Sequence, residues 1–133
     1  MALNELHRAR TLIFSCKYHV VFCPKYRRKV LVPPIDTRIK EMVLEKQDLY
    51  SYTVVEIEVM PDHVHLLLDV DPRVGIDAVV RKIKGYTAYR ILQEYPWMKQ
   101  RLPSLWTRSR FIATVGAVSL ETVKRYIEEQ KGA

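Results

Sequence analysis

The chain is poor in several features that mark common protein classes. Its 133 residues include only two cysteines, Cys16 and Cys23. They lie seven positions apart in what reads as one extended strand, so they would lie on opposite faces, roughly 23 Å apart, and cannot pair there. No apolar run reaches transmembrane length, and residues 1–8 lack the apolar centre of a signal peptide. These absences predict a cytoplasmic protein without membrane association.

Glycine is also scarce, with four isolated residues at positions 75, 85, 116 and 132. No glycine-rich loop is present to cradle phosphates, so a nucleotide cofactor and ATP-driven chemistry are not expected. Repeats, low-complexity tracts and linkers are absent as well, and we expect residues 1–133 to form one domain. Acidic residues are outnumbered by basic ones, 15 against 22, and the net charge of +7 favours a polyanionic partner.

The apolar pattern predicts an α+β fold with a ferredoxin-like (RRM-like) antiparallel sheet. Strands are predicted over residues 13–23, 51–60 and 105–115, with another beginning at His63 after a Pro-Asp turn. Asp36 is a candidate N-cap for a first helix, residues 76–87 have the spacing of a second, and Ser119 can cap a C-terminal catalytic helix. Residues 24–29 and 96–103 read as loops. The order β-α-β-β-α-β-α places two helices on one face of the sheet.

The strand that begins at His63 carries a candidate metal site. Alternation along a strand points His63 and His65 to one face, with Cα atoms about 6.5 Å apart, and Val64 to the core. Two neutral imidazoles suit a divalent transition metal, and an added oxygen ligand would suit Mg²⁺ or Mn²⁺. A third imidazole two residues on would indicate a histidine-triad hydrolase, but that position is Leu67.

A candidate nucleophile lies near the end of the chain. Tyr126 and Gln130 are four residues apart, on one face of the predicted last helix. A phenol with a pKa near 10 needs help to attack, and a metal could polarise a phosphate for it. Gln130 could donate a neutral oxygen to a hard cation, with Glu129 as a rival ligand. Together the residues suggest metal-assisted attack of tyrosine on a nucleic-acid phosphate.

Basic residues alternate with aromatic ones in three stretches of the chain. Cations can neutralise phosphates while rings stack on unpaired bases, as in proteins that bind single-stranded or hairpin nucleic acid. The candidate DNA-binding residues are Lys25, Arg27, Arg28, Lys29, Lys82, Lys84, Arg90, Arg108 and Arg110.

Four segments together resemble one known family. They are Tyr-His-Val-Val-Phe-Cys-Pro-Lys-Tyr-Arg-Arg (18–28), Val-Met-Pro-Asp-His-Val-His-Leu-Leu (59–67), Ala-Thr-Val-Gly (113–116) and Val-Lys-Arg-Tyr-Ile-Glu-Glu-Gln (123–130). In this order they resemble the single-tyrosine HUH transposases (TnpA type) of the smallest bacterial and archaeal insertion sequences. The combined match is far more specific than any one segment.

The resemblance implies an enzyme that cuts and rejoins single-stranded DNA at hairpin-containing element ends, with Mg²⁺ or Mn²⁺ and no ATP. It implies that Tyr126 forms a 5′-phosphotyrosine and that His63, His65 and Gln130 bind the metal. It also implies a homodimer in which His63 and His65 of one chain meet Tyr126 of the other. A short joint at Gly116 and Ala117 would let the last helix pack on either subunit.

Other interpretations of the sequence are also open. A domesticated HUH nuclease, or a nickase of the replication-initiator or relaxase type, would share the chemistry but serve another process. A non-catalytic ferredoxin-like module that binds RNA or single-stranded DNA would explain the charge and the aromatic residues. That module would leave His63, His65, Tyr126 and Gln130 without a role.

Overall fold

A computed structural model describes residues 7–8, 11–115 and 120–132. A short hairpin of β1 (His7–Arg8) and β2 (Ile13–Phe14) precedes the central elements. The strands of the main sheet are β3 (Lys17–Phe22), β4 (Tyr52–Met60), β5 (His63–Val70) and β6 (Phe111–Thr114). The α-helices are α1 (Ile35–Glu45), α2 (Gln47–Tyr50), α3 (Ile76–Glu94), α4 (Met98–Arg101) and α5 (Leu120–Glu129). Two 3₁₀ turns, η1 (Lys25–Arg27) and η2 (Gln130–Gly132), complete the described part.

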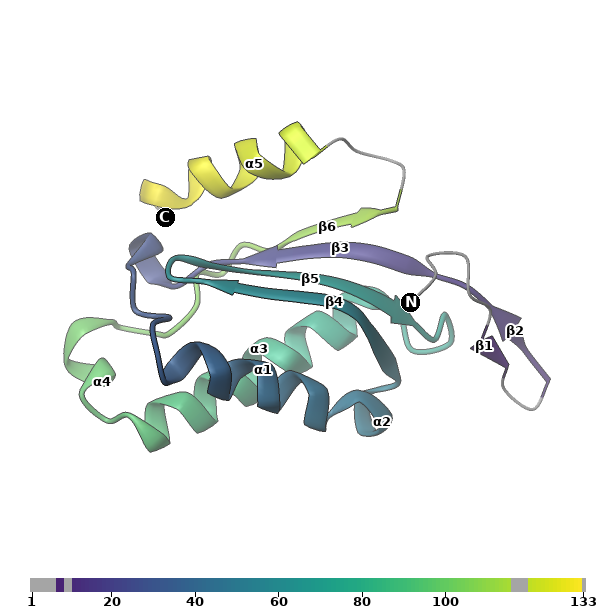
Figure 1. Ribbon diagram of the computed structural model, residues 1–133, viewed down its shortest axis with the longest axis horizontal. Coiled ribbons are helices and arrows are strands. Elements are labelled where there is room, and N and C mark those ends of the chain that lie inside the picture. Colours follow the sequence, from purple (N-terminus) through teal and green to yellow (C-terminus); the bar gives the residue numbers. More distant parts are fainter. Residues whose placement is uncertain (1–6, 9–10, 116–119, 133) are drawn as a thin grey trace.

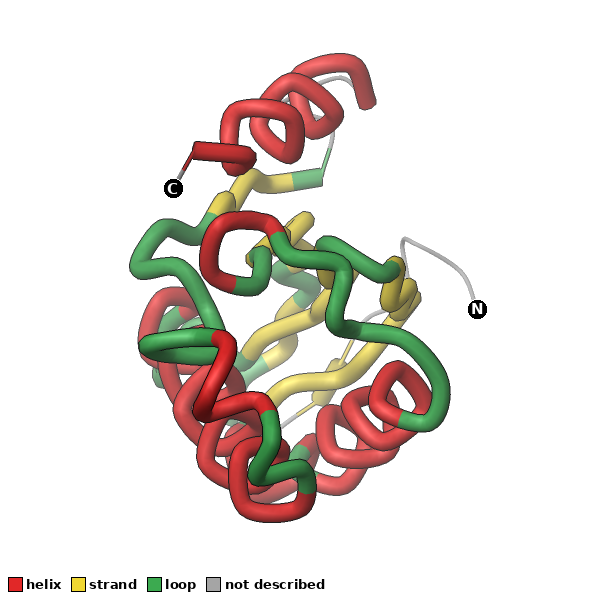
Figure 2. Tube along the Cα trace, turned by 90° about the vertical axis from the view of Figure 1, so that its left-hand side faces the viewer, coloured by secondary structure: helices red, strands yellow, loops and turns green. Residues whose placement is uncertain are grey.

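The main sheet is antiparallel, in the order β4-β5-β3-β6. Helices α1 and α3 cover one of its faces, and α5 lies over the other (Figure 1). Figure 2 shows the same three layers from the end of the molecule. This arrangement confirms the predicted ferredoxin-like sheet with two helices on one face and a separate C-terminal helix.

The hydrophobic core lies between the sheet and helices α1 and α3. Strand residues Val20, Val64 and Leu66 are fully buried there, opposite Ile39 and Val80 of the helices. Because side chains alternate along a strand, the neighbours of these residues point to the opposite face, beneath α5. The core therefore fixes which strand residues are available for chemistry.

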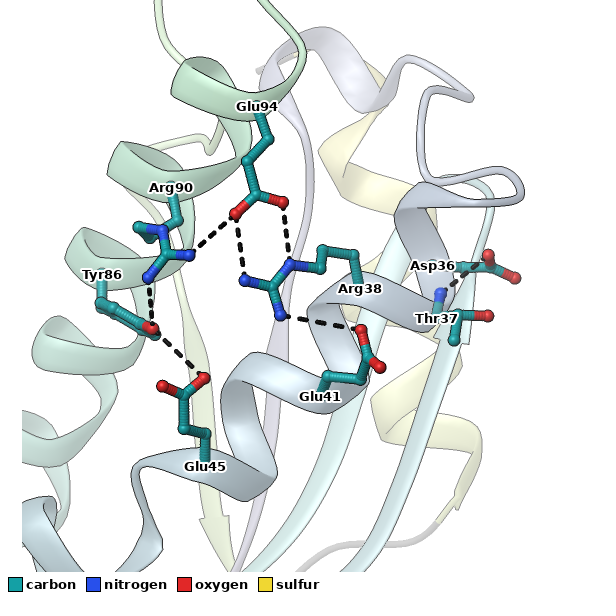
Figure 3. A network of polar contacts seen from close by, with 8 residues as sticks. All are labelled: Asp36, Thr37, Arg38, Glu41, Glu45, Tyr86, Arg90 and Glu94. Atoms are coloured by element: carbon teal, nitrogen blue, oxygen red, sulfur yellow. Dashed lines mark hydrogen bonds and ion pairs between the residues drawn. The ribbon is translucent and has the colours of Figure 1, made fainter.

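The polar network in Figure 3 joins α1 to α3 at their outer surface. Glu94 accepts hydrogen bonds from Arg38 Nε at 2.8 Å and from Arg90 Nη2 at 3.0 Å. Arg90 also donates to the Tyr86 hydroxyl, which in turn donates to Glu45. This network holds the two helices side by side without contributing to the opposite face of the sheet.

Several predicted element boundaries were wrong. Helix α1 begins at Ile35, directly after Pro34, so Asp36 lies inside the first turn and is not the N-cap. Among the described residues, its Oδ1 accepts a hydrogen bond from the Thr37 N–H alone. Residues 15–16 separate β2 from β3. Residues 105–110 form no continuous strand: Trp106 forms an isolated bridge with Pro24, and the Thr107 N–H donates to Cys23 O.

Two predicted loops contain short helices, and one strand is irregular. The turn η1 lies in the basic segment and α4 lies between Pro96 and Pro103. A bulge at Val55 shifts the register of β4 against β5, so the buried side switches from Val54 to Val59 across it. Ser119, Gly116 and Ala117, the predicted cap and joint, lie outside the described residues. Among the described residues, no helix has the length and apolar character needed to cross a membrane.

Candidate active site

The two histidines lie side by side on the sheet face beneath α5. They belong to β5, a central strand that pairs with β3 on one side and β4 on the other. Val64 and Leu66 anchor the strand with no exposed surface, while His63 and His65 are half-buried on the other face. The predicted alternation is thus confirmed, and the rigid centre of the sheet fixes both imidazoles.

A carboxylate orients His63. Its Nδ1 is 2.8 Å from Asp62 Oδ1, and Asp62 Oδ2 accepts from Arg27 Nε at 2.9 Å. Burial would raise the pKa of Asp62, but the hydrogen bond to His63 and the charges of His63 and Arg27 outweigh it, so the pKa is lowered. With Nδ1–H donating to this carboxylate, Nε2 is the ring nitrogen of His63 that is left to bind a metal.

His65 has a different partner, His19 of β3. His65 Nε2 and His19 Nδ1 are 3.2 Å apart, so the two nitrogens share one hydrogen between them. Burial, reinforced by His19, lowers the pKa of His65 and favours its neutral form. His19 was not among the site residues predicted from the sequence. Only the β3–β5 register, which places His65 opposite Val21, brings the two rings together.

A cavity of about 560 Å³ separates His63 and His65 from α5. The sheet contributes Glu58, Met60, His63 and His65, and α5 contributes Val123, Lys124, Ile127 and Glu128. Tyr126 does not line this cavity, because successive helix residues point about 100° apart. The described conformation therefore does not bring the predicted nucleophile to the predicted metal ligands.

Tyr126 instead faces the segment before β6. Its hydroxyl oxygen is 2.8 Å from Ser109 Oγ, and its ring lies 5.1 Å from that of Phe111. Burial raises the pKa of Tyr126, and the hydrogen bond with Ser109 acts in the opposite direction. In this position the phenol is neutral at physiological pH. Ser109, like His19, was not among the site residues predicted from the sequence.

Gln130 lies in η2, one residue beyond the end of α5, rather than within the helix as predicted. Its side chain is buried, with 6% exposed, and Oε1 has no hydrogen-bond partner among the described residues. Buried amide oxygens are normally satisfied, so this atom is suited to accept a cation. The rival ligand, Glu129, is exposed.

The described residues contain no group of three or more His, Cys, Asp or Glu side chains that could hold a metal ion. A metal at this site would therefore need ligands beyond the two histidines. The Oε1 of Gln130, which has no hydrogen-bond partner among the described residues, fits that need chemically, and substrate or water oxygens would complete the shell.

Four of the predicted DNA-binding residues form hydrogen bonds or ion pairs within the protein. Arg27, in the left-handed region with φ 50°, bonds Asp62 and also reaches Ile127 O and Glu128 of α5. Arg90 binds within the α1–α3 network. Arg110 forms a bidentate pair with Asp77.

Lys84 is the fourth. It donates to the carbonyls of Thr107 and Ser109, and more distantly to that of Arg108. Burial, together with the charge of Arg110, lowers the pKa of Lys84 to about 8. Lys84 thus fixes the segment that carries Ser109.

The remaining five predicted residues are differently placed. The Lys25 and Lys82 ammonium groups lie 5.2 Å and 5.6 Å from tyrosine ring centroids. Within the described part of the chain, Arg28, Lys29 and Arg108 form no ion pair. Their charges are available to a partner.

The sequence matches a family of known proteins. The model of the family described as IS200-like transposases matches residues 12–130. The chain belongs to this family. Membership makes it a DNA-processing enzyme, and the match includes His63, His65, Tyr126 and Gln130.

Relatives of this IS200-like transposase cover almost its full length. The ISDra2 transposase TnpA of Deinococcus radiodurans is 35% identical over 128 residues, which are 95% of this chain and 91% of the relative. The transposase for insertion sequence element IS200 of Salmonella typhimurium is 27% identical over 123 residues, 89% and 81% of the two chains.

Two solved structures share the fold. A crystal structure of a candidate transposase from Deinococcus radiodurans R1 has a TM-score of 0.87 and 31% identity, covering 96% of this chain and 99% of that one. A REP-associated tyrosine transposase bound to a REP hairpin has a TM-score of 0.57 and 11% identity, covering 92% of this chain and 68% of that one. The second likeness shows the fold alone.

Proposed function

We propose that this transposase cuts and rejoins single-stranded DNA at hairpin-containing ends, with Tyr126 as nucleophile. His63, His65 and Gln130 would hold Mg²⁺ or Mn²⁺. The observation that carries the proposal is the pair of imidazoles on a rigid strand, one oriented by Asp62, facing a cavity whose other wall is the helix that bears a tyrosine. The structural neighbour bound to a REP hairpin supports a hairpin substrate, and the net charge of +7 of this chain supports a nucleic-acid partner.

In the proposed reaction, Tyr126 Oη attacks a backbone phosphorus atom. The bond from phosphorus to the 3′ oxygen breaks, a phosphotyrosine forms on the 5′ side, and the tyrosine proton ends on the released 3′ hydroxyl. The bound metal would withdraw charge from the phosphate oxygens during attack. Rejoining is the reverse attack by a 3′ hydroxyl, which needs no ATP because the phosphotyrosine keeps the energy of the broken bond.

Tyr126 must move, or come from a second chain, for this reaction. In the described conformation it contacts Ser109 and Phe111, while other residues of α5 face the histidines. We propose a homodimer in which α5 of each chain brings Tyr126 to the histidines of its partner. Two such sites are equivalent by twofold symmetry.

The cleavage test uses an end-labelled single strand that contains a hairpin, incubated with Mn²⁺. The wild-type protein should yield a covalent protein–DNA product, and Tyr126→Phe should bind the strand equally but form none, because only the attacking oxygen is removed. Binding without cleavage by the wild-type protein would favour the non-catalytic module. A covalent product with Tyr126→Phe would assign another nucleophile.

The shared site is tested by mixing two inactive variants, Tyr126→Phe and the double variant His63→Ala/His65→Ala. After verified subunit exchange, one site of each heterodimer combines intact histidines with an intact Tyr126 if sites form between chains. Recovered cleavage would support the shared site. Unrecovered activity despite exchange would refute it, because sites within one chain each lack an essential group.

A further inference from the structure

A second cavity, of about 490 Å³, lies at the end of the molecule where α4 and the segment after β3 come together. Figures 1 and 2 both place these two segments at the same end. Arg28, Lys29 and Val30 line it from one side and Arg101 of α4 from the other. Val30 is buried and packs into the hydrophobic core, so it forms the floor of the cavity. The three cationic side chains line the rest of it.

The charges around this cavity are not neutralised by the protein. Within the described part of the chain, Arg28, Lys29 and Arg101 have no carboxylate partner. Other arginines do, such as Arg38 with Glu94. Three cations without ion-pair partners among the described residues line one cavity, and such a cluster can neutralise an anion such as a backbone phosphate.

An exposed aromatic ring adjoins the cavity through Arg101. Trp97 directly precedes α4 and keeps 43% of its surface exposed, although it is a large apolar side chain. The Arg101 guanidinium carbon lies 5.3 Å from its ring centroid. The other tryptophan, Trp106, is 6% exposed, packed edge-on against Phe22 and bonded to Thr87. Trp97 therefore offers a ring for stacking where Trp106 cannot.

The cavity is linked to the candidate active site by neighbouring residues. Arg28 follows Arg27, whose guanidinium bonds Asp62, and Asp62 bonds His63. The Leu31 N–H also donates to Pro61 O, which fixes the lining segment against the turn before the histidine strand. A strand bound in the cavity is thus close in the fold to the proposed cleavage site.

We infer that Arg28, Lys29, Arg101 and Trp97, here termed the α4 subsite, bind an unpaired nucleotide that flanks the cleaved phosphate. The phosphate lies in the cavity among the three cations, and the base stacks on Trp97. Duplex DNA fits less well because its bases are already stacked and cannot reach the ring. The position next to the cleavage site rests on the proposed function, whereas binding of unpaired DNA does not.

Tryptophan fluorescence tests the α4 subsite without any cleavage, using the Tyr126→Phe protein and an unstructured oligothymidine. Binding should quench the emission saturably, and adding Trp97→Phe should remove the quenching, since Trp106 is buried. Base stacking on an aromatic residue contributes roughly 1–3 kcal/mol, so Trp97→Phe, which keeps a smaller ring, should weaken binding about threefold to tenfold. A duplex of equal length should quench little.

Charge at the subsite is tested by Arg101→Ala, with Arg81→Ala as the matched control. Arg81 is also an exposed arginine, on α3, and has no ion pair within the described residues. Arg101→Ala should weaken oligothymidine binding about tenfold. It should also make the slope of log affinity against log salt concentration shallower by about the amount that one phosphate contact contributes, while Arg81→Ala should change neither quantity.

Three results would overturn the inference: quenching that survives Trp97→Phe, equal effects of Arg101→Ala and Arg81→Ala, or duplex binding that needs Trp97 as much as the single strand does. These results are independent of cleavage. If the protein binds oligothymidine through Trp97 but never cleaves a hairpin strand, the proposed function fails and the α4 subsite stands.

Discussion

Replacing Ser109 with alanine tests whether Tyr126 must leave its present contact before it reacts. The two hydroxyl oxygens are 2.8 Å apart, and Ser109 is exposed, so alanine removes one hydrogen bond without disturbing the core. A neutral hydrogen bond of this kind contributes about 1 kcal/mol net. Losing it from the resting position should raise the population of released Tyr126 about fivefold.

The assay is single-turnover formation of the covalent adduct on an end-labelled hairpin strand with Mn²⁺. If release of Tyr126 precedes attack, Ser109→Ala should form the adduct about fivefold faster at unchanged hairpin affinity. Ser104→Ala is the matched control, because Ser104 is exposed in the same segment and its Oγ donates to Trp106 O at 3.1 Å, its one side-chain hydrogen bond among the described residues. A rate equal to or below that of the wild type would refute the reasoning, since Ser109 would then not restrain Tyr126.

Three further predictions follow from the site and the fold. His63→Ala or His65→Ala should abolish metal-dependent cleavage and leave hairpin affinity within about twofold in a filter-binding assay, because phosphate contacts dominate affinity; unchanged cleavage would make the pair structural. Hydrogen bonding to Arg38 lowers the pKa of Glu94 in the folded protein. The pairing therefore contributes its full stabilisation at pH values above the usual carboxyl pKa, and this stabilisation disappears as the pH falls through the lowered pKa. Glu94→Gln should therefore lower the melting temperature at neutral pH, and circular dichroism should show the difference vanishing well below about pH 4; an equal difference at both pH values would contradict this. Burial raises the pKa of the Cys23 thiol to about 12. Ellman's reagent should therefore react with at least one thiol fewer in the native protein than in the unfolded protein.

Much of the fold could be predicted because local patterns determine it. The alternation around His63 and His65 fixed their common face, and the helical spacing of Val79, Val80 and Ile83 fixed the buried side of α3. These patterns depend on which side chains avoid water, a property that each residue carries with it.

The parts that were missed depend on contacts between distant segments. Trp106 lies in a stretch rich in strand-forming residues, yet its ring packs on Phe22, its indole nitrogen donates to Thr87, and its backbone forms only an isolated bridge with Pro24 within the described residues. His19 reaches His65 only through the pairing of two strands, and Ser109 reaches Tyr126 only because α5 folds back over β6. No local pattern encodes such pairings.

The basic residues illustrate the same limit. Composition cannot tell Arg110, bound to Asp77, from Arg28, which lines a cavity without an ion pair among the described residues. Arg101 and Trp97 were not among the predicted DNA-binding residues, because their significance comes from the cavity that α4 shares with a segment some seventy residues earlier.

The most direct test of the central claim is to identify the residue that becomes attached to DNA. After incubation with a hairpin strand and Mn²⁺, trypsin should cut after Arg125 and Lys131 and release a six-residue peptide whose single tyrosine is Tyr126. Mass spectrometry should find the nucleotide joined through its 5′ phosphate to this peptide. A nucleotide on the peptide that holds Tyr86 and Tyr89, or cleaved DNA with no peptide attached, would contradict the account.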